Sequence, residues 1–481
     1  MTLLIHRFER PAAKSEPLYQ PREPIYPKLV HGRFRALKWG LMAVMLAIYY
    51  GVPWIRWPRP NGATQQAVMV DFSHARFWFG PIHLWPQDVY LLTGLLVMAA
   101  LALFLSNALF GRLWCGYACP QTVWTDLYIY IERLFEGDRN ARMRLDRQPW
   151  SLDKVWRKAG KHLAWLVVAA ATGGAWIFYF HDAPTLWRQF WGGTAPLSAY
   201  ASFTILTFTT YMLAGMMREQ VCTYMCPWPR IQGAMLDQHS LQVTYRRDRG
   251  EPRGAHKTGS SWEGRGDCVD CMQCVAACPM GIDIRDGGQL ECINCALCID
   301  ACDEIMGKVG RPSGLIAFDT DAAVLAREAT QPATYKLVRS RTIYYAVALA
   351  VVSILMIWGL AQRRVIEVNV VRDRNPMFVR LHDGSIRNGY TLKIANRTLT
   401  PQEVRIGFSG ISGAVLKIPG EDAAKGEVAA VLDPDTESAL RVLVTAPRRA
   451  NLAGMTPAAF TVAAKDASKT QSTVFATGAP Q

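Results

Sequence analysis

This sequence of 481 residues lacks the signatures of several large cofactor-binding classes. It has no Gly-rich phosphate loop, neither a Walker motif nor a dinucleotide fingerprint, so no nucleotide or flavin site is evident. It has no Cys-x-x-Cys-His sequence for haem c, and no long apolar segment has a histidine near its centre, which argues against haem b. We therefore expect any redox chemistry to depend on other side chains.

Acidic residues are outnumbered, with 39 Asp and Glu against 53 Lys and Arg. The excess of basic residues does not indicate nucleic-acid binding, because these residues lie next to long apolar segments rather than on one folded face. Half of the residues are hydrophobic, which is typical of a membrane protein with soluble parts. Five segments come near the ~20 residues that a membrane-spanning helix needs. They cover residues 39–55, 89–110, 163–180, 197–217 and 342–361.

The basic residues also predict how the chain crosses the membrane. Residues 1–38 contain eight Lys and Arg and residues 111–161 contain ten, whereas residues 58–88 contain two and residues 182–196 only Arg188. Because basic residues collect on the cytoplasmic side, we expect a multi-pass protein of the bacterial inner membrane, in contact with lipid, with a cytoplasmic N-terminus. The first apolar segment lacks a signal-peptide cleavage site and is expected to remain as an anchor. An odd number of spans places the C-terminus outside.

Five parts follow from this topology. They are a basic cytoplasmic segment at 1–38, a four-helix membrane region at 39–217, a cytoplasmic segment at 218–341, a fifth span at 342–361 and an extracytoplasmic domain at 362–481. The last part has no cysteine and alternates apolar and polar residues in short runs, such as 365–371, 390–395, 403–408 and 459–463. Short strands at this spacing predict an immunoglobulin-like β-sandwich without the inter-sheet disulfide.

Eight of the twelve cysteines form two runs of the pattern Cys-x-x-Cys-x-x-Cys-x-x-x-Cys, within a ferredoxin-like domain at about 260–310. The first run is Cys268, Cys271, Cys274 and Cys278, and the second is Cys292, Cys295, Cys298 and Cys302. This spacing is typical of proteins that bind two 4Fe–4S clusters, in which the fourth cysteine of each run binds the other cluster. The pattern predicts Cys268, Cys271, Cys274 and Cys302 on one cluster and Cys292, Cys295, Cys298 and Cys278 on the other.

Zinc is the main alternative ligand, because paired Cys-x-x-Cys motifs also bind it. Zinc sites use two such pairs and have no need of a third cysteine at the same step, so iron–sulfur clusters explain the spacing better. A disulfide framework is less favoured still, because the flanking charges place this segment in the reducing cytoplasm.

The remaining four residues, Cys115, Cys119, Cys222 and Cys226, are called the membrane-edge cysteines below. They form two Cys-x-x-x-Cys-Pro motifs, at 115–120 and 222–227, directly after the second and fourth apolar segments. A spacing of four predicts both sulfurs on one helical face, and the following proline prevents the last cysteine from continuing an ordinary helix. Packing of small apolar residues is the plain alternative. Because none of the twelve cysteines lies outside a motif, we favour a redox or metal role. Spacing leaves open a third iron–sulfur cluster, a copper site and a dithiol.

With these motifs, the chain resembles the CcoG family, also called FixG or RdxA, which are accessory proteins for the assembly of cbb3-type cytochrome c oxidase. The resemblance covers almost the whole length: the basic segment, five spans, both Cys-x-x-x-Cys-Pro motifs, the ferredoxin-like domain and the immunoglobulin-like tail. It differs from a regular ferredoxin in that Asp303 and not proline follows Cys302.

The resemblance implies an oxidoreductase that reduces Cu(II) to Cu(I), with copper as substrate at the membrane-edge cysteines and two 4Fe–4S clusters as electron carriers. It implies a copper-exporting P-type ATPase and oxidase assembly factors as partners, whereas the electron donor stays unassigned. Two other functions are compatible with the sequence. One is a quinol-linked electron carrier with further clusters at the membrane-edge cysteines, and the other is a non-enzymatic scaffold for oxidase assembly.

Overall fold

A computed structural model gives the fold of residues 24–59, 64–73, 75–256, 259, 261–362, 366–420, 426–448, 454–465 and 468–478. Most of the predicted basic segment, residues 1–23, lies outside the described residues, as does residue 365 of the first predicted strand. The chain divides into two compact units, residues 1–53 with 96–351 and residues 54–95 with 352–481, and each is described by itself.

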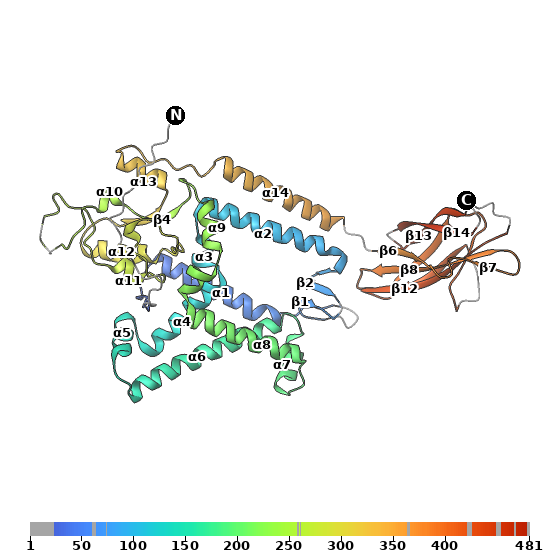
Figure 1. The fold of residues 1–481 in the computed structure, drawn as a ribbon, viewed down its shortest axis with the longest axis horizontal. Helices are drawn as coiled ribbons and strands as arrows, with labels where there is room; N and C mark the ends of the chain where they lie inside the picture. The colour runs from blue at the N-terminus through green and yellow to red at the C-terminus, as the bar shows by residue number, and fades with distance from the viewer. Residues whose placement is uncertain are drawn as a thin grey trace, which may run out of the picture. The chain divides into compact units, whose positions relative to one another are not determined.

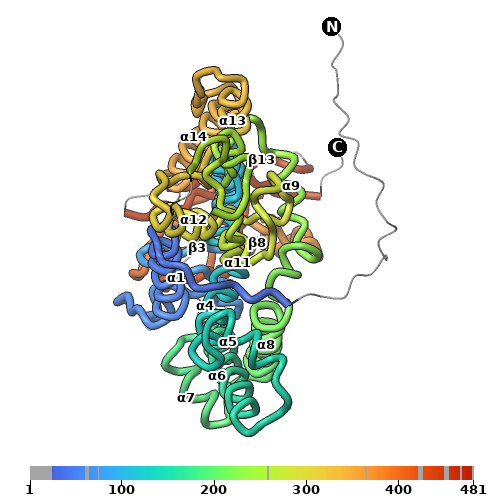
Figure 2. The backbone as a smooth tube through the Cα atoms, turned by 90° about the vertical axis from the view of Figure 1, so that its left-hand side faces the viewer, coloured from blue at the N-terminus to red at the C-terminus, as the bar shows by residue number. Residues whose placement is uncertain are grey.

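The helices of the first unit fall into a membrane part and a cysteine-rich part (Figure 1). The membrane part contains α1 Arg33–Gly51, α2 Val89–Phe110 (which begins in the second unit), α3 Leu113–Tyr117, α4 Pro120–Glu136, α5 Arg139–Arg147, α6 Leu152–Ile177, α7 Ala183–Trp191, α8 Leu197–Thr210 and α9 Trp228–Met235. Helix α14, Ser340–Ala361, continues into the second unit. Helix α6 packs against α4 and α8, as Figure 2 shows from another side.

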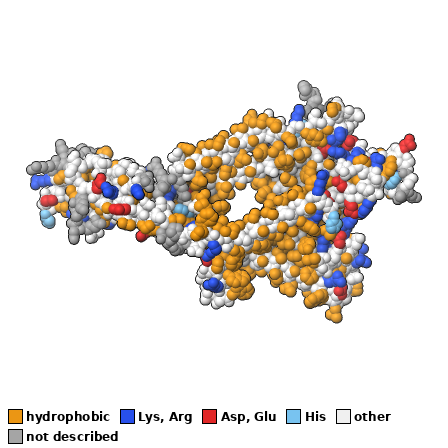
Figure 3. Space-filling view, turned by 180° about the vertical axis from the view of Figure 1, so that it is seen from behind, with side chains coloured by type: hydrophobic (Ala, Val, Ile, Leu, Met, Phe, Trp, Pro, Cys, Tyr) orange, Lys and Arg blue, Asp and Glu red, His pale blue; other side chains and the backbone are white. Residues whose placement is uncertain are grey.

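Four helices are long and apolar enough to cross a membrane: Arg33–Trp54, Pro86–Phe110, Leu197–Met217 and Ser340–Ala361. Their hydrophobic side chains are largely exposed, and Figure 3 shows them covering the long helices, with charged side chains collected over the cysteine-rich part. These four match the first, second, fourth and fifth predicted spans, with a first span that begins earlier than residue 39.

The third predicted span, 163–180, lies mostly within α6, which begins earlier, at Leu152, and ends at Ile177. The first half of α6 is charged and packs against acidic residues of α4. Lys161 Nζ lies 2.7 Å from Glu136 Oε1, and Lys158 Nζ lies 3.0 Å from the same oxygen. Helix α6 is therefore not among the four helices that are long and apolar enough to cross a membrane. The count of five spans stays a prediction.

The cysteine-rich part is framed by two antiparallel strands, β4 Gln242–Tyr245 and β5 Ile316–Asp319. Between them lie α10 Arg247–Gly250, α11 Gln273–Ala277, the short helix η5 Ile284–Asp286 and α12 Leu297–Lys308, and α13 Asp321–Glu328 follows β5. The frame is wider than the predicted 260–310, because β4 lies well before the first cysteine run. Val243 and Tyr245 of β4 share a buried core with Cys268, Cys274 and Cys302.

The second unit contains an immunoglobulin-like sandwich of two sheets, which confirms that part of the predicted fold. One sheet has the order β10-β12-β8-β6, with β7 paired to β8, and the other has the order β11-β9-β13-β14. The strands are β6 Ile366–Arg372, β7 Val379–Arg380, β8 Ile386–Asn396, β9 Gln402–Ser409, β10 Val415–Lys417, β11 Glu427–Leu432, β12 Thr436–Ala446, β13 Met455–Ala463 and β14 Ser468–Ala476. Alternate residues of β8, Tyr390, Leu392 and Ile394, are fully buried between the sheets.

A small sheet that the sequence analysis did not predict belongs to the same unit. Strands β1 Val68–Asp71, β2 Arg76–Phe79 and β3 Ile82–Leu84 pair antiparallel in that order. They are tied to the sandwich by ion pairs: Asp435 Oδ1 lies 3.6 Å from Arg76 Nε and 3.3 Å from His83 Nε2. The residues between the first two spans therefore form part of the tail's folded unit.

Candidate functional site

The chain turns in the same way in the two cysteine runs, because residues at equivalent positions of the two runs have left-handed backbone conformations. Asp270 and Met272, on either side of Cys271, have φ of 56° and 54°. Asn294 and Ala296, on either side of Cys295, have φ of 53° and 61°. Left-handed conformations are costly for residues other than glycine and collect at functional sites. Here they turn each loop around its cysteines, which is what a compact cluster requires.

The fourth cysteine of each run lies beside the other run. Burial raises the pKa of Cys302 to about 12, and the charges of Cys274, Cys268 and Cys271 act in the same direction. Burial also raises the pKa of Cys278 to about 12, with Cys295 as the next cause and Cys292 as a smaller one. We call Cys268, Cys271, Cys274 and Cys302 the first thiol group, and Cys278, Cys292, Cys295 and Cys298 the second.

The second thiol group lines one cavity. All four of its cysteines face this cavity, together with Cys274 and apolar side chains such as Ile282 and Ile284. Among the described residues, no group of three or more His, Cys, Asp or Glu side chains is placed to hold a single metal ion. Four thiols that line one apolar cavity fit the ligand set of a four-iron cluster.

The membrane-edge cysteines are brought together from two distant parts of the chain. Burial raises the pKa of Cys115 to about 12, and the other three membrane-edge cysteines add to the rise. Burial likewise raises the pKa of Cys222 to about 12, with Cys119 as the next cause. These thiols stay protonated at neutral pH unless a bound cation displaces the proton, so the site selects soft cations that bind thiolate strongly.

The backbone of the two membrane-edge motifs differs from the expected single helical face. Helix α3 ends at Tyr117, and Cys119 is extended with φ −63° and ψ 129° before α4 begins. Cys222 lies in a π-helical turn, η4 Val221–Met225, and Cys226 is extended with φ −81° and ψ 122°. The proline after each of these cysteines explains the shared extended conformation. The paired sulfurs therefore come from a helix end and the turn that follows it.

The first membrane-edge motif is docked directly on the second cysteine run. Cys115 lies in the same buried apolar cluster as Cys295. The backbone approach is close at Gly116, where a Cβ atom would lie 2.7 Å from the carbonyl oxygen of Ile293. The Cys115 thiol also donates a hydrogen bond of 3.2 Å to Gln232 Oε1 of α9. The sequence analysis missed Gly116 and Gln232. The only sequence signal for the contact with Ile293 is the small residue, Gly116, between Cys115 and Cys119.

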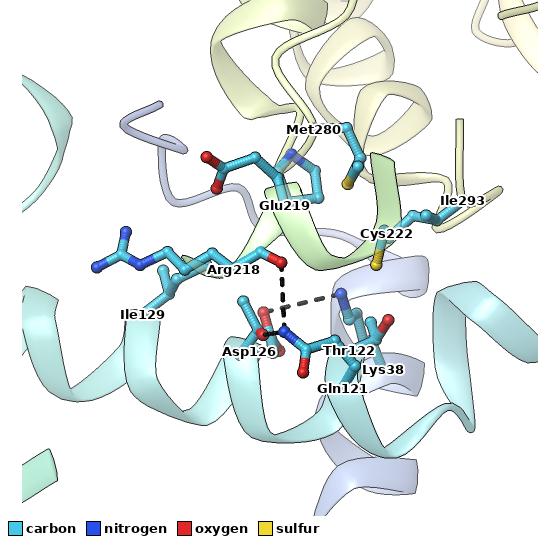
Figure 4. A pocket seen from close by; sticks show the side chains of 12 residues that line it. Lys38, Gln121, Thr122, Asp126, Ile129, Arg218, Glu219, Cys222, Met280 and Ile293 are labelled. Carbon is cyan, nitrogen blue, oxygen red and sulfur yellow. Dashed lines mark hydrogen bonds and ion pairs between the residues drawn. The ribbon is translucent and has the colours of Figure 1, made fainter. Parts of the chain in front are cut away.

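A pocket of about 350 Å³ lies beside Cys222, between α4, η4 and the cysteine-rich part (Figure 4). The Cys222 sulfur faces the pocket together with Lys38 of α1 and Asp126 of α4. Asp126 Oδ1 accepts a hydrogen bond of 2.9 Å from Arg35 and lies 3.8 Å from Lys38 Nζ. All three charged side chains are buried. Two cations therefore share the Asp126 carboxylate, and Arg218 and Glu219 also line the pocket.

Three family models match parts of the chain. The model described as a 4Fe-4S dicluster domain matches residues 217–321, and a 4Fe-4S binding domain matches residues 91–137. The model described as an IG-like fold at the C-terminus of FixG matches residues 356–478. The first match contains both cysteine runs and the second membrane-edge motif, and the second match contains Cys115 and Cys119.

Named relatives are similar over nearly the full length. The nitrogen fixation protein FixG of Rhizobium meliloti is 47% identical over 90% of this chain and 88% of its own. Protein RdxA of Cereibacter sphaeroides is 47% identical over 90% of this chain and 92% of its own. Protein RdxB of the same organism is 48% identical over 86% of this chain and 87% of its own.

Proposed function

Because this chain belongs to the FixG/RdxA family and is an iron–sulfur electron-transfer protein, we propose that it reduces Cu(II) to Cu(I) at the membrane-edge cysteines. The observation that carries this proposal is that Cys115 and Cys295 belong to one buried apolar cluster. It places a set of soft ligands next to the residues that would hold an electron carrier. Electron transfer over such a contact needs no domain movement.

The first and second thiol groups would each hold one 4Fe–4S cluster, with the ligands crossed between the two runs. When bound, these clusters supply electrons one at a time. The chain contributes an apolar cavity that keeps water from the second cluster and left-handed turns that fix its cysteines. Arg112 of the loop after α2 anchors the second run, since its side chain donates to the carbonyl oxygen of Cys292 at 3.2 Å.

The ligand chemistry favours reduction. Thiolates stabilise Cu(I) over Cu(II), so a copper ion that enters the membrane-edge site becomes a better electron acceptor there. Each copper ion takes one electron and leaves as Cu(I). Reduced copper is the form that the family resemblance assigns to a copper-exporting P-type ATPase, for delivery during the assembly of cbb3-type oxidase. Under this proposal the tail beyond the fifth span is an extracytoplasmic docking domain for an assembly partner.

A direct assay tests the proposal. Full-length protein is purified anaerobically in detergent, its clusters are reduced, and Cu(II) is added with a chelator that reports Cu(I). The wild type should produce Cu(I), and the double variant Cys119→Ala, Cys222→Ala should lose most of this activity while keeping the iron of the two runs. Thr223→Ala is the control, because Thr223 lies next to Cys222 and its hydroxyl only donates to the Glu219 carbonyl oxygen. Equal Cu(I) production by the double variant would contradict the proposal.

One observation favours a second candidate function. The 4Fe-4S binding domain match at 91–137 contains Cys115 and Cys119, and no group of His, Cys, Asp or Glu among the described residues is placed for a single metal ion. The membrane-edge cysteines would then hold a further cluster, and the protein would pass electrons from a quinol. Iron and sulfide analysis separates the two, because about eight irons per chain leave the membrane-edge cysteines free and about twelve place a cluster there.

A further inference from the structure

The pocket beside Cys222 and the cavity of the second thiol group have a common wall. Met280 and Ile293 line both of them. Met280 belongs to the sequence Cys278-Pro279-Met280, so a rigid proline joins it to a member of the second thiol group. It is half-buried and packs against the apolar cluster that contains Cys115 and Cys295. The wall therefore lies between the second thiol group and the pocket of Cys222.

Met280 brings a second kind of sulfur to the pocket. Figure 4 shows the sulfur atoms of Cys222 and Met280 on the side of the pocket opposite Gln121 and Thr122. A thioether is a soft ligand that suits Cu(I), and it is much less suited to Cu(II), which prefers nitrogen and oxygen ligands. It is also neutral and has no proton to lose. It can therefore bind a cation without adding negative charge and without competition from protons.

The charged groups of the pocket suit Cu(I) less well than the two sulfurs do. Asp126 is engaged by Arg35 and Lys38, and the Lys38 ammonium has no lone pair to offer. Glu219 also lines the pocket, and its carboxylate is a hard ligand. Cu(I) can be held by two soft ligands, and the sulfurs of Cys222 and Met280 provide that number in this pocket.

We propose that Met280 is a thioether ligand for copper beside Cys222, at the wall of the second cluster site. This inference rests on the proposed cupric-reductase function and deepens it. Cu(II) binds as the Cys222 thiol gives its proton to solvent, and it then accepts one electron from the reduced centre held by the second thiol group. That centre returns to its oxidised state, and Cu(I) remains bound by the Cys222 thiolate and the Met280 thioether.

The plain alternative is that Met280 only fills space, and the variant Met280→Leu distinguishes the two. Leucine preserves the volume and apolar character of the side chain and removes the sulfur. Met306→Leu is the matched control, because Met306 is a buried methionine in the core next to the first thiol group and lines neither cavity. The full chain is used in detergent, anaerobically, with Cu(I) itself as the probe.

The decisive readout is Cu(I) affinity, measured by competition with a chelator of known affinity. We expect Met280→Leu to weaken Cu(I) binding on the order of tenfold or more and to slow Cu(II) reduction, with Met306→Leu unchanged. X-ray absorption at the copper edge should show one sulfur ligand fewer in Met280→Leu. Full Cu(I) affinity and an unchanged sulfur count in that variant would overturn the assignment while the cupric reductase stands. If the wild type neither binds Cu(I) nor reduces Cu(II), the proposed function fails and the assignment fails with it.

Discussion

The Tyr117 hydroxyl donates a hydrogen bond of 3.1 Å to the carbonyl oxygen of Cys295, 178 residues further along the chain. Tyr117 stands between the two cysteines of the first membrane-edge motif and is 4% exposed. Cys295 is the second of the four cysteines of the second run. The bond therefore fixes the first membrane-edge motif to the backbone of the second run.

Gly116→Ala should disrupt the junction without removing a ligand. The added Cβ would lie 2.7 Å from the Ile293 carbonyl oxygen, and because the oxygen belongs to the backbone and the backbone of residue 116 fixes the Cβ, one segment must move. We expect a loss of about 1–3 kcal/mol in the stability of this contact and a strong fall in the transfer of electrons to copper. Iron content of the two runs should be unchanged.

Gly40→Ala is the control for this experiment. Gly40 lies in α1, and a Cβ there would meet nothing within 4 Å. That variant should be as active as the wild type. If Gly116→Ala also passes electrons at the wild-type rate, the close approach of the two motifs is not required for transfer.

Lys38→Met should lower the reduction potential of a centre bound at Cys222. The Lys38 ammonium faces the same pocket as the Cys222 sulfur, and its charge favours an added electron there. Without it, Arg35 and Asp126 remain as a neutral pair, so the fold should tolerate the change. A shift of roughly 60 mV corresponds to a tenfold change for one electron, and we expect an effect of this order in a potentiometric titration. Lys38→Arg, which keeps the charge, should leave the potential near the wild-type value.

Copper affinity should rise with pH. Burial raises the pKa of Cys115 and of Cys222 to about 12, so both thiols are protonated between pH 6 and pH 8. Each thiol that becomes a ligand releases one proton, which increases Cu(I) affinity about tenfold per pH unit. Chelator competition at three pH values gives the number of protons released. Cys222→Ser should lower that number by one, whereas Met280→Leu should weaken binding at every pH without changing the slope.

Much of this arrangement could be predicted from the sequence where a short-range rule applies. The spacing of the two cysteine runs, four of the apolar spans and the alternation along Tyr390–Ile394 all reflect local periodicity. The prolines after Cys119 and Cys226 correctly predicted that these residues leave the helix. The spacing could not predict that the first membrane-edge motif packs against the second cysteine run. The contact of Gly116 with Ile293 depends on tertiary packing, which no local pattern records.

The errors have physical causes of the same kind. The sequence places the charged residues at the start of α6 in a loop before the third span. Their partners, Glu132 and Glu136, lie on another helix, so the local sequence does not indicate that these charges are paired. The sheet β1–β3 has strands of only three or four residues, too short for alternation to be evident. Asp126 was not singled out from the sequence, although it is 5% exposed between Arg35 and Lys38.

Asp435→Asn should destabilise the second unit. Asp435 pairs with Arg76 and His83 of the small sheet, in a partly buried position. Asparagine keeps the shape and tolerates the left-handed conformation of this residue, φ 48°, so the change removes mainly the charge. We expect a loss of about 1–3 kcal/mol in the free energy of unfolding. Glu437→Gln is the control, since its pair with Lys393 is 37–49% exposed and contributes less than about 1 kcal/mol.

Cys278→Ala and Cys302→Ala test the crossed arrangement of the two runs. Cys278 lies beside Cys295 and Cys292, so its loss should damage the centre of the second run although it belongs to the first. Cys302 lies beside Cys274, Cys268 and Cys271, so its loss should damage the centre of the first run. Ligation within each run would give the opposite result.

Cys278→Ala and Cys302→Ala should also differ in copper reduction. The second thiol group shares its wall with the Cys222 pocket, so Cys278→Ala should block copper reduction even when the other centre is fully reduced. Cys302→Ala should leave the last step intact, since an electron supplied artificially to the remaining centre can still reach Cys222. Electron paramagnetic resonance of each variant identifies the centre that is lost, and single-turnover Cu(II) reduction shows which centre lies next to copper. Copper reduction by Cys278→Ala at the wild-type rate would mean that electrons reach Cys222 by a route that does not cross the wall of Met280 and Ile293.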